Sequence, residues 1–186
     1  PLSYNAQPNA LYHNNGDGTF TETTKQAGVY KEGRAMSATV SDFRNSGRLD
    51  IFVTNDAMEN YFFESNGKGG FAENALTYGI AYGENGQGVS SMGPVVGDFN
   101  RDGLLDIFIP NLNYCTLFTQ TLRNGMRNFV DQTAVTGLSV VMGQYAGWGA
   151  VSFDYDNDGW LDLFTAHGDA HHEYVQENTL MRNKGN

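Results

Sequence analysis

Short runs of alternating hydrophobic and polar residues recur along the chain and predict β-strands rather than helices. Three of these runs cover residues 49–54, 105–109 and 161–165, and each begins at the end of a polar, aspartate-rich stretch. Another extended run precedes each polar stretch, and these runs cover residues 36–40, 92–96 and 149–153. Each polar stretch is therefore predicted to be the loop of a strand–loop–strand hairpin.

The polar stretches are copies of one nine-residue sequence. They read DFRNSGRLD, DFNRDGLLD and DYDNDGWLD, and they begin 56 residues apart at Asp42, Asp98 and Asp154. A second pattern, an Asn-Gly turn followed by phenylalanine, predicts further hairpins and recurs at 15–20, 66–71 and 124–129. The sequence around this second pattern starts a fourth time at Asn178. The chain therefore consists of internal repeats.

About four short strands in a repeat of about 50 residues are typical of a β-propeller blade. A blade cannot bury both of its faces alone, so it stacks on its neighbours. We therefore expect an all-β fold of four-stranded antiparallel blades, with residues 1–186 forming one propeller segment. The expected units are approximately 1–35 (a partial blade), 36–87, 88–144 and 145–186 (an incomplete blade). Because these units fall short of a comfortable closed ring, we interpret the chain as a segment of a larger propeller.

Composition narrows the classes of partner. The 186 residues include 21 acidic side chains against 11 lysines and arginines, for a net charge of -10. This balance argues against a nucleic-acid partner, which requires a basic surface, and against binding to an anionic membrane. No apolar run approaches the length of a membrane span, so we expect no membrane insertion, and the Pro1-Leu2 start shows no signal peptide. Cys115 is the only cysteine, which excludes an intrachain disulfide and a cysteine-based zinc site.

The third aspartate loop has the chemistry of a calcium site. Its oxygen donors stand at alternate positions, with a glycine at the bend, and comprise the side chains of Asp154, Asp156, Asp158 and Asp162 and the carbonyl of Trp160. Carboxylates this close repel one another unless a cation lies among them. Ca²⁺ accepts six to eight oxygens in flexible geometry, whereas Mg²⁺ requires a stricter octahedron. The second loop repeats the set with Asp98, Asn100, Asp102, the Leu104 carbonyl and Asp106, so two Ca²⁺ sites are predicted.

The first loop departs from this pattern, because Arg44 and Ser46 stand between Asp42 and Asp50. A guanidinium at this place can neutralise the two remaining carboxylates in place of an ion. We therefore predict no tight calcium binding by Asp42 and Asp50, which would be the ligands of a third site.

Two other interpretations of the aspartate loops compete with that of a calcium site between two strands. An EF-hand requires a glutamate at position 12 and flanking helices, but Ile109 and Thr165 occupy that position and the flanks alternate like strands. Solvated acidic turns would also contain Asp, Asn and Gly. Two nearly perfect copies at identical spacing favour the metal interpretation.

These motifs resemble a known family. The aspartate loops and Asn-Gly turns are similar to those of FG-GAP/VCBS repeats, whose best-known members are integrin α-subunit propellers. More narrowly, residues 9–20, 53–56 and 147–162 resemble ASPIC/UnbV-type (cartilage acidic protein-like) repeat proteins. The resemblance covers nearly all of the chain. It implies a calcium-stabilised propeller, commonly of seven blades, outside the cytoplasm, with the ligands named above in the second and third loops and with adhesion or binding as its use.

Other candidate chemistry is weaker. The polar segment 167–173 offers His167, His171 and His172 but lacks the order of a two-histidine zinc motif. A polysaccharide-active enzyme would require an acidic pair outside the loops, for which Glu173 and Glu177 are the candidates. A sugar-stacking surface would use aromatic side chains, and blade packing competes with it for Tyr145, Trp148, Tyr155 and Trp160.

The sequence therefore favours a non-catalytic binding or adhesion module that is extracellular, on the cell surface or periplasmic. Its expected partner is a protein or a glycan. The alternatives are an assembly or accessory subunit of a larger extracellular complex or filament, joined to neighbouring subunits through the matching half-units at its ends, and the scaffold of a polysaccharide-active enzyme.

Overall fold

The computed structural model describes residues 4–169 and 175–185 of the chain. Its regular structure is short antiparallel strands with three helices of four or five residues, so the predicted all-β fold without long helices is confirmed. The helices are α1 (Thr24–Ala27), α2 (Ala75–Tyr78) and α3 (Leu138–Met142). None of these helices, within the described ranges, is long and apolar enough to span a membrane.

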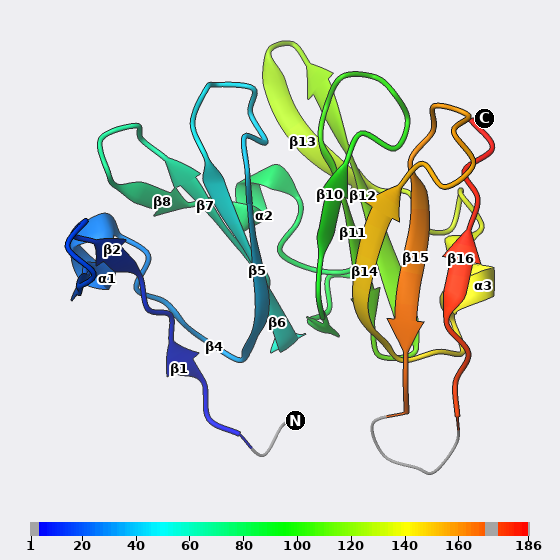
Figure 1. The fold of residues 1–186 in the computed structure, drawn as a ribbon, viewed down its shortest axis with the longest axis horizontal. Helices are drawn as coiled ribbons and strands as arrows, with labels where there is room; N and C mark the ends of the chain where they lie inside the picture. Colours follow the sequence, from blue (N-terminus) through cyan, green and yellow to red (C-terminus); the bar gives the residue numbers. More distant parts are fainter. Residues whose placement is uncertain (1–3, 170–174, 186) are drawn as a thin grey trace.

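Three sheets lie side by side in chain order (Figure 1). Sheet A contains β5 (Ala35–Ser41), β6 (Asp50–Met58), β7 (Tyr61–Ser65) and β8 (Phe71–Glu73), and β9 (Val89–Ser90) pairs with the far end of β6. Sheet B contains β10 (Val95–Gly97), β11 (Asp106–Asn111), β12 (Tyr114–Arg123) and β13 (Met126–Asp131). Sheet C contains β14 (Gly147–Phe153), β15 (Asp162–His167) and β16 (Thr179–Met181).

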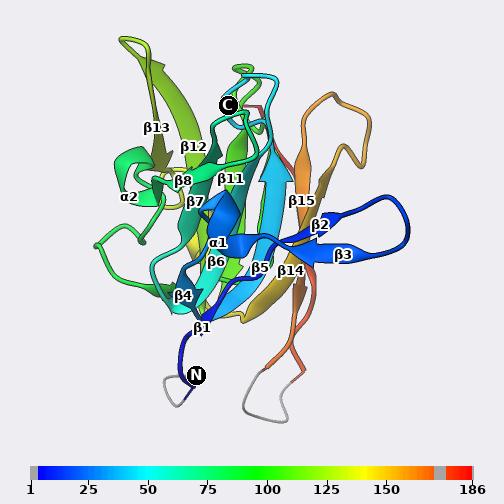
Figure 2. The ribbon, with the colours of Figure 1, turned by 90° about the vertical axis from the view of Figure 1, so that its left-hand side faces the viewer.

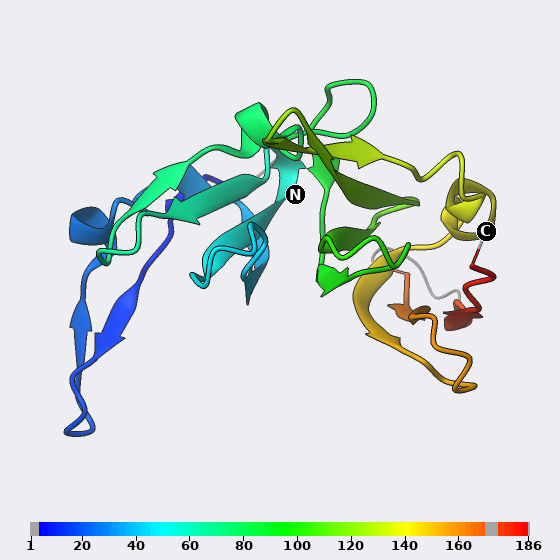
Figure 3. The same ribbon diagram turned by 90° about the horizontal axis from the view of Figure 1, so that it is seen from above.

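The N-terminal part adds two smaller pairs of strands. A hairpin of β2 (Tyr12–Asn14) and β3 (Phe20–Glu22) extends away from sheet A (Figures 2 and 3). A second pair joins β1 (Gln7–Pro8) to β4 (Glu32–Gly33). Seen from above, the hairpin and the three sheets follow one another along a curve, as stacked blades do (Figure 3).

Both predicted kinds of hairpin are present. The aspartate loops join β5 to β6, β10 to β11 and β14 to β15. The Asn-Gly turns join β2 to β3, β7 to β8 and β12 to β13. The strand expected over 92–96 is shorter than predicted, because it begins only at Val95, after Pro94, which has no N–H to donate. The N–H of Met92 instead donates to the Pro110 carbonyl, and that of Gly93 to the Trp148 carbonyl of sheet C.

The sheets pack face to face, and β11 shows how. All six of its residues are buried, although alternation is typical of a strand with one exposed face. Ile107 and Ile109 lie in a core cluster with Phe52 and Phe62 of sheet A, whereas Phe108 lies in a second cluster that includes residues of sheet C. Sheet B is therefore covered on both faces by its neighbours.

Candidate calcium-binding loops

The first aspartate of each loop holds the loop closed through two backbone hydrogen bonds. In the second loop, Asp98 accepts from the N–H of Asp102 over 3.1 Å and from that of Gly103 over 2.9 Å. The corresponding bonds to Asp154 measure 3.0 and 2.8 Å, and those to Asp42 measure 2.8 and 2.7 Å. The bend needs a positive φ at the glycine, +84° at Gly103, a conformation that glycine adopts without a steric cost. The three loops therefore share one backbone conformation.

The ninth residue of each loop is a fully buried aspartate that fastens the loop to the third strand of its sheet. Asp50, Asp106 and Asp162 are each 0% exposed. Asp106 accepts from the N–H of Gln120 on β12 over 2.9 Å, and Asp162 accepts from the N–H of Asn183, just beyond β16, over 2.8 Å. Asp50 accepts from Ser65 of β7 in the same way over 2.8 Å. The sequence analysis assigned Asp106 and Asp162 to an ion and Asp50 to the charge of Arg44, and it missed these hydrogen bonds to the third strand.

Burial makes the charge on Asp106 unfavourable. Desolvation raises the pKa of this carboxyl to about 6, although the hydrogen bonds from the Gln120 and Phe99 N–H groups lower it. The neighbouring charges of Asp98 and Asp102 raise it further. A cation in the second loop would favour the ionised form of Asp106.

Three of the four predicted carboxylate ligands of the third loop lie close together. Asp154, Asp156 and Asp162 each place one oxygen within 4.8 Å of the others, in the one such group found among the described residues. Asp158, the fourth predicted ligand, accepts instead from the N–H of Trp160 over 2.9 Å. In the second loop, Asn100 donates to Asp102 over 3.0 Å, and Asp102 accepts from the N–H of Leu104 over 2.9 Å.

An arginine crosses the third loop. Arg182, one residue beyond β16, donates from Nε to Asp156 over 2.6 Å and from Nη2 to Asp158 over 2.8 Å. The aspartates raise the pKa of Arg182, which keeps the guanidinium charged. Two of the predicted calcium ligands therefore have a cationic partner that the loop sequence itself does not contain.

The first loop carries its own arginine, which pairs with one of the two loop carboxylates and with a glutamate outside the loop. Arg44 pairs bidentately with the buried Asp50, over 2.9 and 2.8 Å, and with Glu64 of β7 over 2.9 Å. Asp42 accepts hydrogen bonds from the backbone N–H groups of Ser46 and Gly47, which lower its pKa, and the charge of Arg44 lowers it further. The guanidinium lies on the strand side of the loop.

Two carboxamides tie neighbouring sheets together at the loops. Gln120 of sheet B donates to the carbonyl of Phe43 in the first loop over 3.0 Å and to that of Leu105 over 3.2 Å. Asn183 repeats this contact one blade later, with the Phe99 carbonyl at 2.8 Å and the Leu161 carbonyl at 3.2 Å. In both residues the backbone N–H donates to the ninth aspartate of the loop in the same sheet. The first and second loops are thus each held to their own sheet and to the next one.

The residues present fit a hard cation. The third loop supplies three converging carboxylates, one of them fully buried, and all predicted side-chain donors are oxygens. Asp154 and Asp162 are held by backbone hydrogen bonds, whereas Asp156 is paired with Arg182. The second loop provides the same set with an asparagine at its third position. No hydrogen bond or ion pair joins this loop's donors to an arginine or lysine side chain in the described part of the chain.

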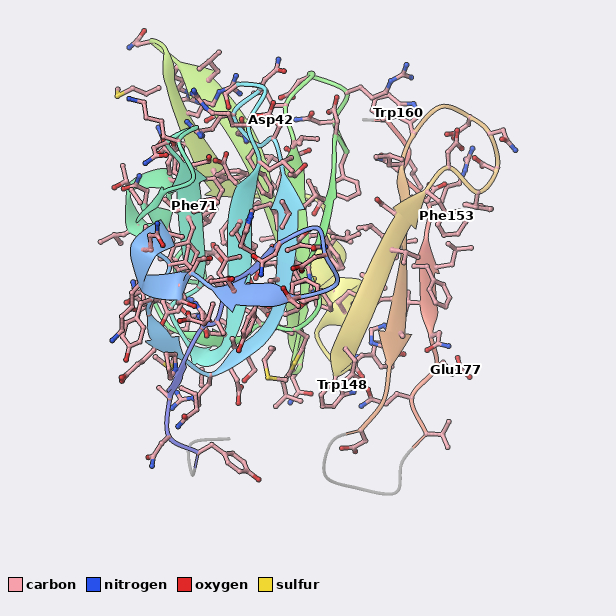
Figure 4. The ribbon with its side chains drawn as sticks, turned by 60° about the vertical axis from the view of Figure 1, so that its left-hand side comes forward. Asp42, Phe71, Trp148, Phe153, Trp160 and Glu177 are labelled. Atoms are coloured by element: carbon pink, nitrogen blue, oxygen red, sulfur yellow. The ribbon has the colours of Figure 1, made fainter. Side chains whose placement is uncertain are left out.

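The remaining candidates that the structure describes are not brought together into a second site. Trp148 lies at one end of the β14–β15 hairpin and Trp160 at the other, so the four aromatic residues do not share one surface (Figure 4). Trp148 donates to the Gly168 carbonyl, and Arg101 lies 5.1 Å from the centroid of the Trp160 ring. Glu177 is exposed, whereas His171, His172 and Glu173 lie outside the described residues.

The contacts and burial of His167 and Cys115 indicate structural roles for both side chains. The His167 ring lies 5.0 Å from that of Tyr145, and its Nε2 is 3.0 Å from Oγ1 of Thr179. Burial lowers the pKa of His167 and raises that of the Cys115 thiol to about 12, so this cysteine is a core residue rather than a nucleophile.

Comparisons with known proteins agree with the loops and hairpins. Residues 2–53 and 42–109 match the FG-GAP-like repeat. The chain is 28% identical to human cartilage acidic protein 1 over 172 residues, and 30% identical to that of Xenopus tropicalis over 178 residues. Each alignment covers 88% of this chain and 25% of the relative, so the chain spans about a quarter of the length of these proteins. The chain belongs to the family of FG-GAP-like repeat proteins.

Proposed function

We propose that the chain is a non-catalytic, extracytoplasmic binding module of the adhesion type, in which the second and third aspartate loops hold Ca²⁺. The observation that carries this proposal is the convergence of Asp154, Asp156 and Asp162 beside the strands that they connect. When bound, the ion would supply the positive charge that allows crowded carboxylates to stay ionised.

Cation binding at these loops is linked to the stability of the blades. The buried Asp106 and Asp162 offer oxygens to the loop and also accept the N–H groups of Gln120 and Asn183 on the third-strand side of the sheet. An ion that holds these carboxylates in place would therefore also hold the third strand of sheet B and the segment that follows the third strand of sheet C. Ligands that bind only the folded state stabilise it, so calcium would raise the melting temperature.

Membership of the FG-GAP-like family and the similarity to cartilage acidic protein 1 support a location outside the cytoplasm and a role in binding. A protein partner is favoured over a glycan. Sugar recognition uses stacked aromatic rings, but Trp148 and Trp160 lie at opposite ends of sheet C (Figure 4). Trp148 donates to the Gly168 carbonyl, and the Trp160 ring is covered by Arg101.

Thermal unfolding in calcium and after EDTA treatment tests the proposal. At a calcium concentration about 100 times Kd, the expected stabilisation is about 2.7 kcal/mol per site. Asp154→Asn should remove part of the calcium-dependent shift. Asp17→Asn, the same substitution in the exposed β2–β3 turn, should leave it unchanged. A melting temperature that EDTA does not alter would refute the role of calcium.

A further inference from the structure

Four asparagines of the chain are followed directly by glycine, and all four are exposed. They are Asn15, Asn66, Asn85 and Asn124. Because glycine has no Cβ, no side chain shields its backbone nitrogen from the amide of the asparagine before it. This sequence is therefore the one at which an asparagine most readily loses its amide, and neither sequence nor exposure distinguishes the four pairs.

The loss of the amide needs a free backbone nitrogen and a free side chain. The glycine nitrogen forms a bond to Cγ of the asparagine, and the bond from Cγ to Nδ2 breaks. Nδ2 leaves as ammonia with the proton of the glycine N–H, and the product is a cyclic succinimide. Water then opens the ring at either carbonyl, which gives aspartate or isoaspartate. A hydrogen bond to either reacting group slows the first step, because that bond must break first.

In three of the pairs the glycine N–H already donates a hydrogen bond. Gly16 donates to Oδ1 of Asn14 over 2.9 Å, and Gly67 donates to Oγ of Ser65 over 3.2 Å. Gly86 donates over 2.9 Å to the carbonyl three residues before it. The attacking nitrogen is therefore engaged in each of these turns.

Two of the three asparagines are also held by their side chains. Asn15 donates to Oγ1 of Thr19 over 2.9 Å and accepts from Thr21 over 3.1 Å. The Asn66 Oδ1 accepts from the N–H groups two and four residues later, over 2.8 and 3.1 Å. Their amides cannot turn toward the following nitrogen while these bonds persist.

The fourth pair has neither restraint. Asn124 and Gly125 form the two-residue turn between β12 and β13, in which Arg123 and Met126 are the last paired residues. Their φ angles are +52° and +77°, both positive as in a type I′ turn. The turn is the tip of a hairpin at the outer edge of the molecule (Figure 2). Over residues 4–169 and 175–185, no hydrogen bond holds the Gly125 N–H or the Asn124 side chain.

We propose that Asn124 is a site of spontaneous modification, which converts to aspartate and isoaspartate through a succinimide closed by the Gly125 nitrogen. The fold protects the other three asparagines. The isoaspartyl product adds a methylene group to the main chain of the turn and places a carboxylate between Arg123 and Arg127. Because the length of the turn sets the register of a hairpin, the strand pairs next to the turn are affected first. The proposal is independent of calcium binding.

The test incubates the 186-residue chain at mildly alkaline pH and follows each pair by mass spectrometry of proteolytic peptides. Electron-transfer fragmentation distinguishes isoaspartate from aspartate. In the folded chain, Asn124 should react at least tenfold faster than Asn15, Asn66 or Asn85. In the chain unfolded by urea, the four pairs should react at similar rates, because the hydrogen bonds that protect three of them are absent.

Gly125→Ala should slow the reaction at Asn124 at least tenfold, because a side chain hinders attack by the nitrogen. Gly69→Ala is the matched control and should leave the rate at Asn124 unchanged. Gly69 also lies in a hairpin turn, and like Gly125 it has a positive φ and no atom within 4 Å of a Cβ built on it, but it does not follow an asparagine. Circular dichroism should show that both variants are folded.

Three results would overturn the proposal. The first is a folded chain in which Asn124 reacts no faster than the other three asparagines. The second is a set of rates in urea that differ as they do in the folded chain, since local sequence would then determine them. The third is a Gly125→Ala variant that reacts at Asn124 as fast as the Gly69→Ala variant.

Discussion

Arg182 and Asp156 form an ion pair across the third loop that repeats, with the charges exchanged, the pair formed by Arg44 and Glu64 across the first loop. Arg44 and Asp156 occupy the third loop position, and Glu64 and Arg182 each precede the residue whose N–H bonds the ninth aspartate. The second loop has the uncharged Asn100 and Thr119 at these places. In the first loop the arginine belongs to the loop and the carboxylate to the third strand, whereas in the third loop the carboxylate belongs to the loop and the arginine follows the third strand. An ion pair at the same place thus balances charge in both sheets.

Exchanging the first loop's residues for those of the second should create a calcium site. Arg44→Asn with Ser46→Asp restores the donor set of the second loop around Asp42 and Asp50. Arg44→Asn alone should destabilise the protein by about 3–5 kcal/mol, because it leaves the buried Asp50 without its cation. Calcium titration of the double variant should show one more site than the wild-type chain.

Arg48→Asn is the matched control for this experiment, since Arg48 belongs to the same loop but is exposed. It should add no site. A double variant that binds no additional calcium would show that the donor set alone does not define these sites.

Removing the arginine from the third loop should strengthen calcium binding there. Arg182 must leave Asp156 and Asp158 before both carboxylates can take an ion, so Arg182→Gln should lower Kd for that loop. Isothermal titration calorimetry measures the change, with Arg123→Gln at an exposed position as the control for net charge. A weaker affinity in Arg182→Gln would mean that the arginine orients the ligands instead of competing for them.

The carboxamide of Gln120 should contribute to the packing of sheets A and B. Gln120→Ala leaves the carbonyls of Phe43 and Leu105 without this donor, at an expected cost of about 1–3 kcal/mol. Urea unfolding measures the loss. Gln26→Ala, at an exposed glutamine, should cost little, and equal stabilities of the two variants would argue against the contact.

Stability should fall in mild acid through His167. Burial lowers the pKa of this histidine below its ordinary value of 6.5, so the unfolded chain binds more protons than the native state below that pH. Its stabilising contribution is therefore complete above pH 6.5 and declines as the pH falls further. Unfolding measurements between pH 7.5 and about 5 should show a smaller decline in His167→Gln than in wild type. The exposed His13→Gln should behave like wild type, and parallel curves for all three proteins would contradict this assignment.

The hairpins were predictable because their signals are local. Asp, Asn and Gly at fixed spacing specify tight turns, and the alternating runs on either side specify strands. The fastening of Asp106 and Asp162 was not predictable, since their partners are backbone N–H groups 14 and 21 residues later, and backbone groups have no sequence signature. The same holds for Arg182, whose carboxylate partners lie 26 and 24 residues before it.

The complete burial of β11 also depends on distant parts of the chain. Ile107 and Phe108 are covered by different neighbouring sheets, so their burial follows from the stacking of blades and not from the period of the strand. The repeat in the sequence indicates such stacking but does not identify the face that each residue occupies.

Calcium stoichiometry tests the central claim most directly. Isothermal titration calorimetry of the metal-free chain should give two Ca²⁺ per molecule, one lost in Asp98→Asn and the other in Asp154→Asn. A chain that binds no calcium, or one that holds a further ion through Asp42 and Asp50, would contradict the account.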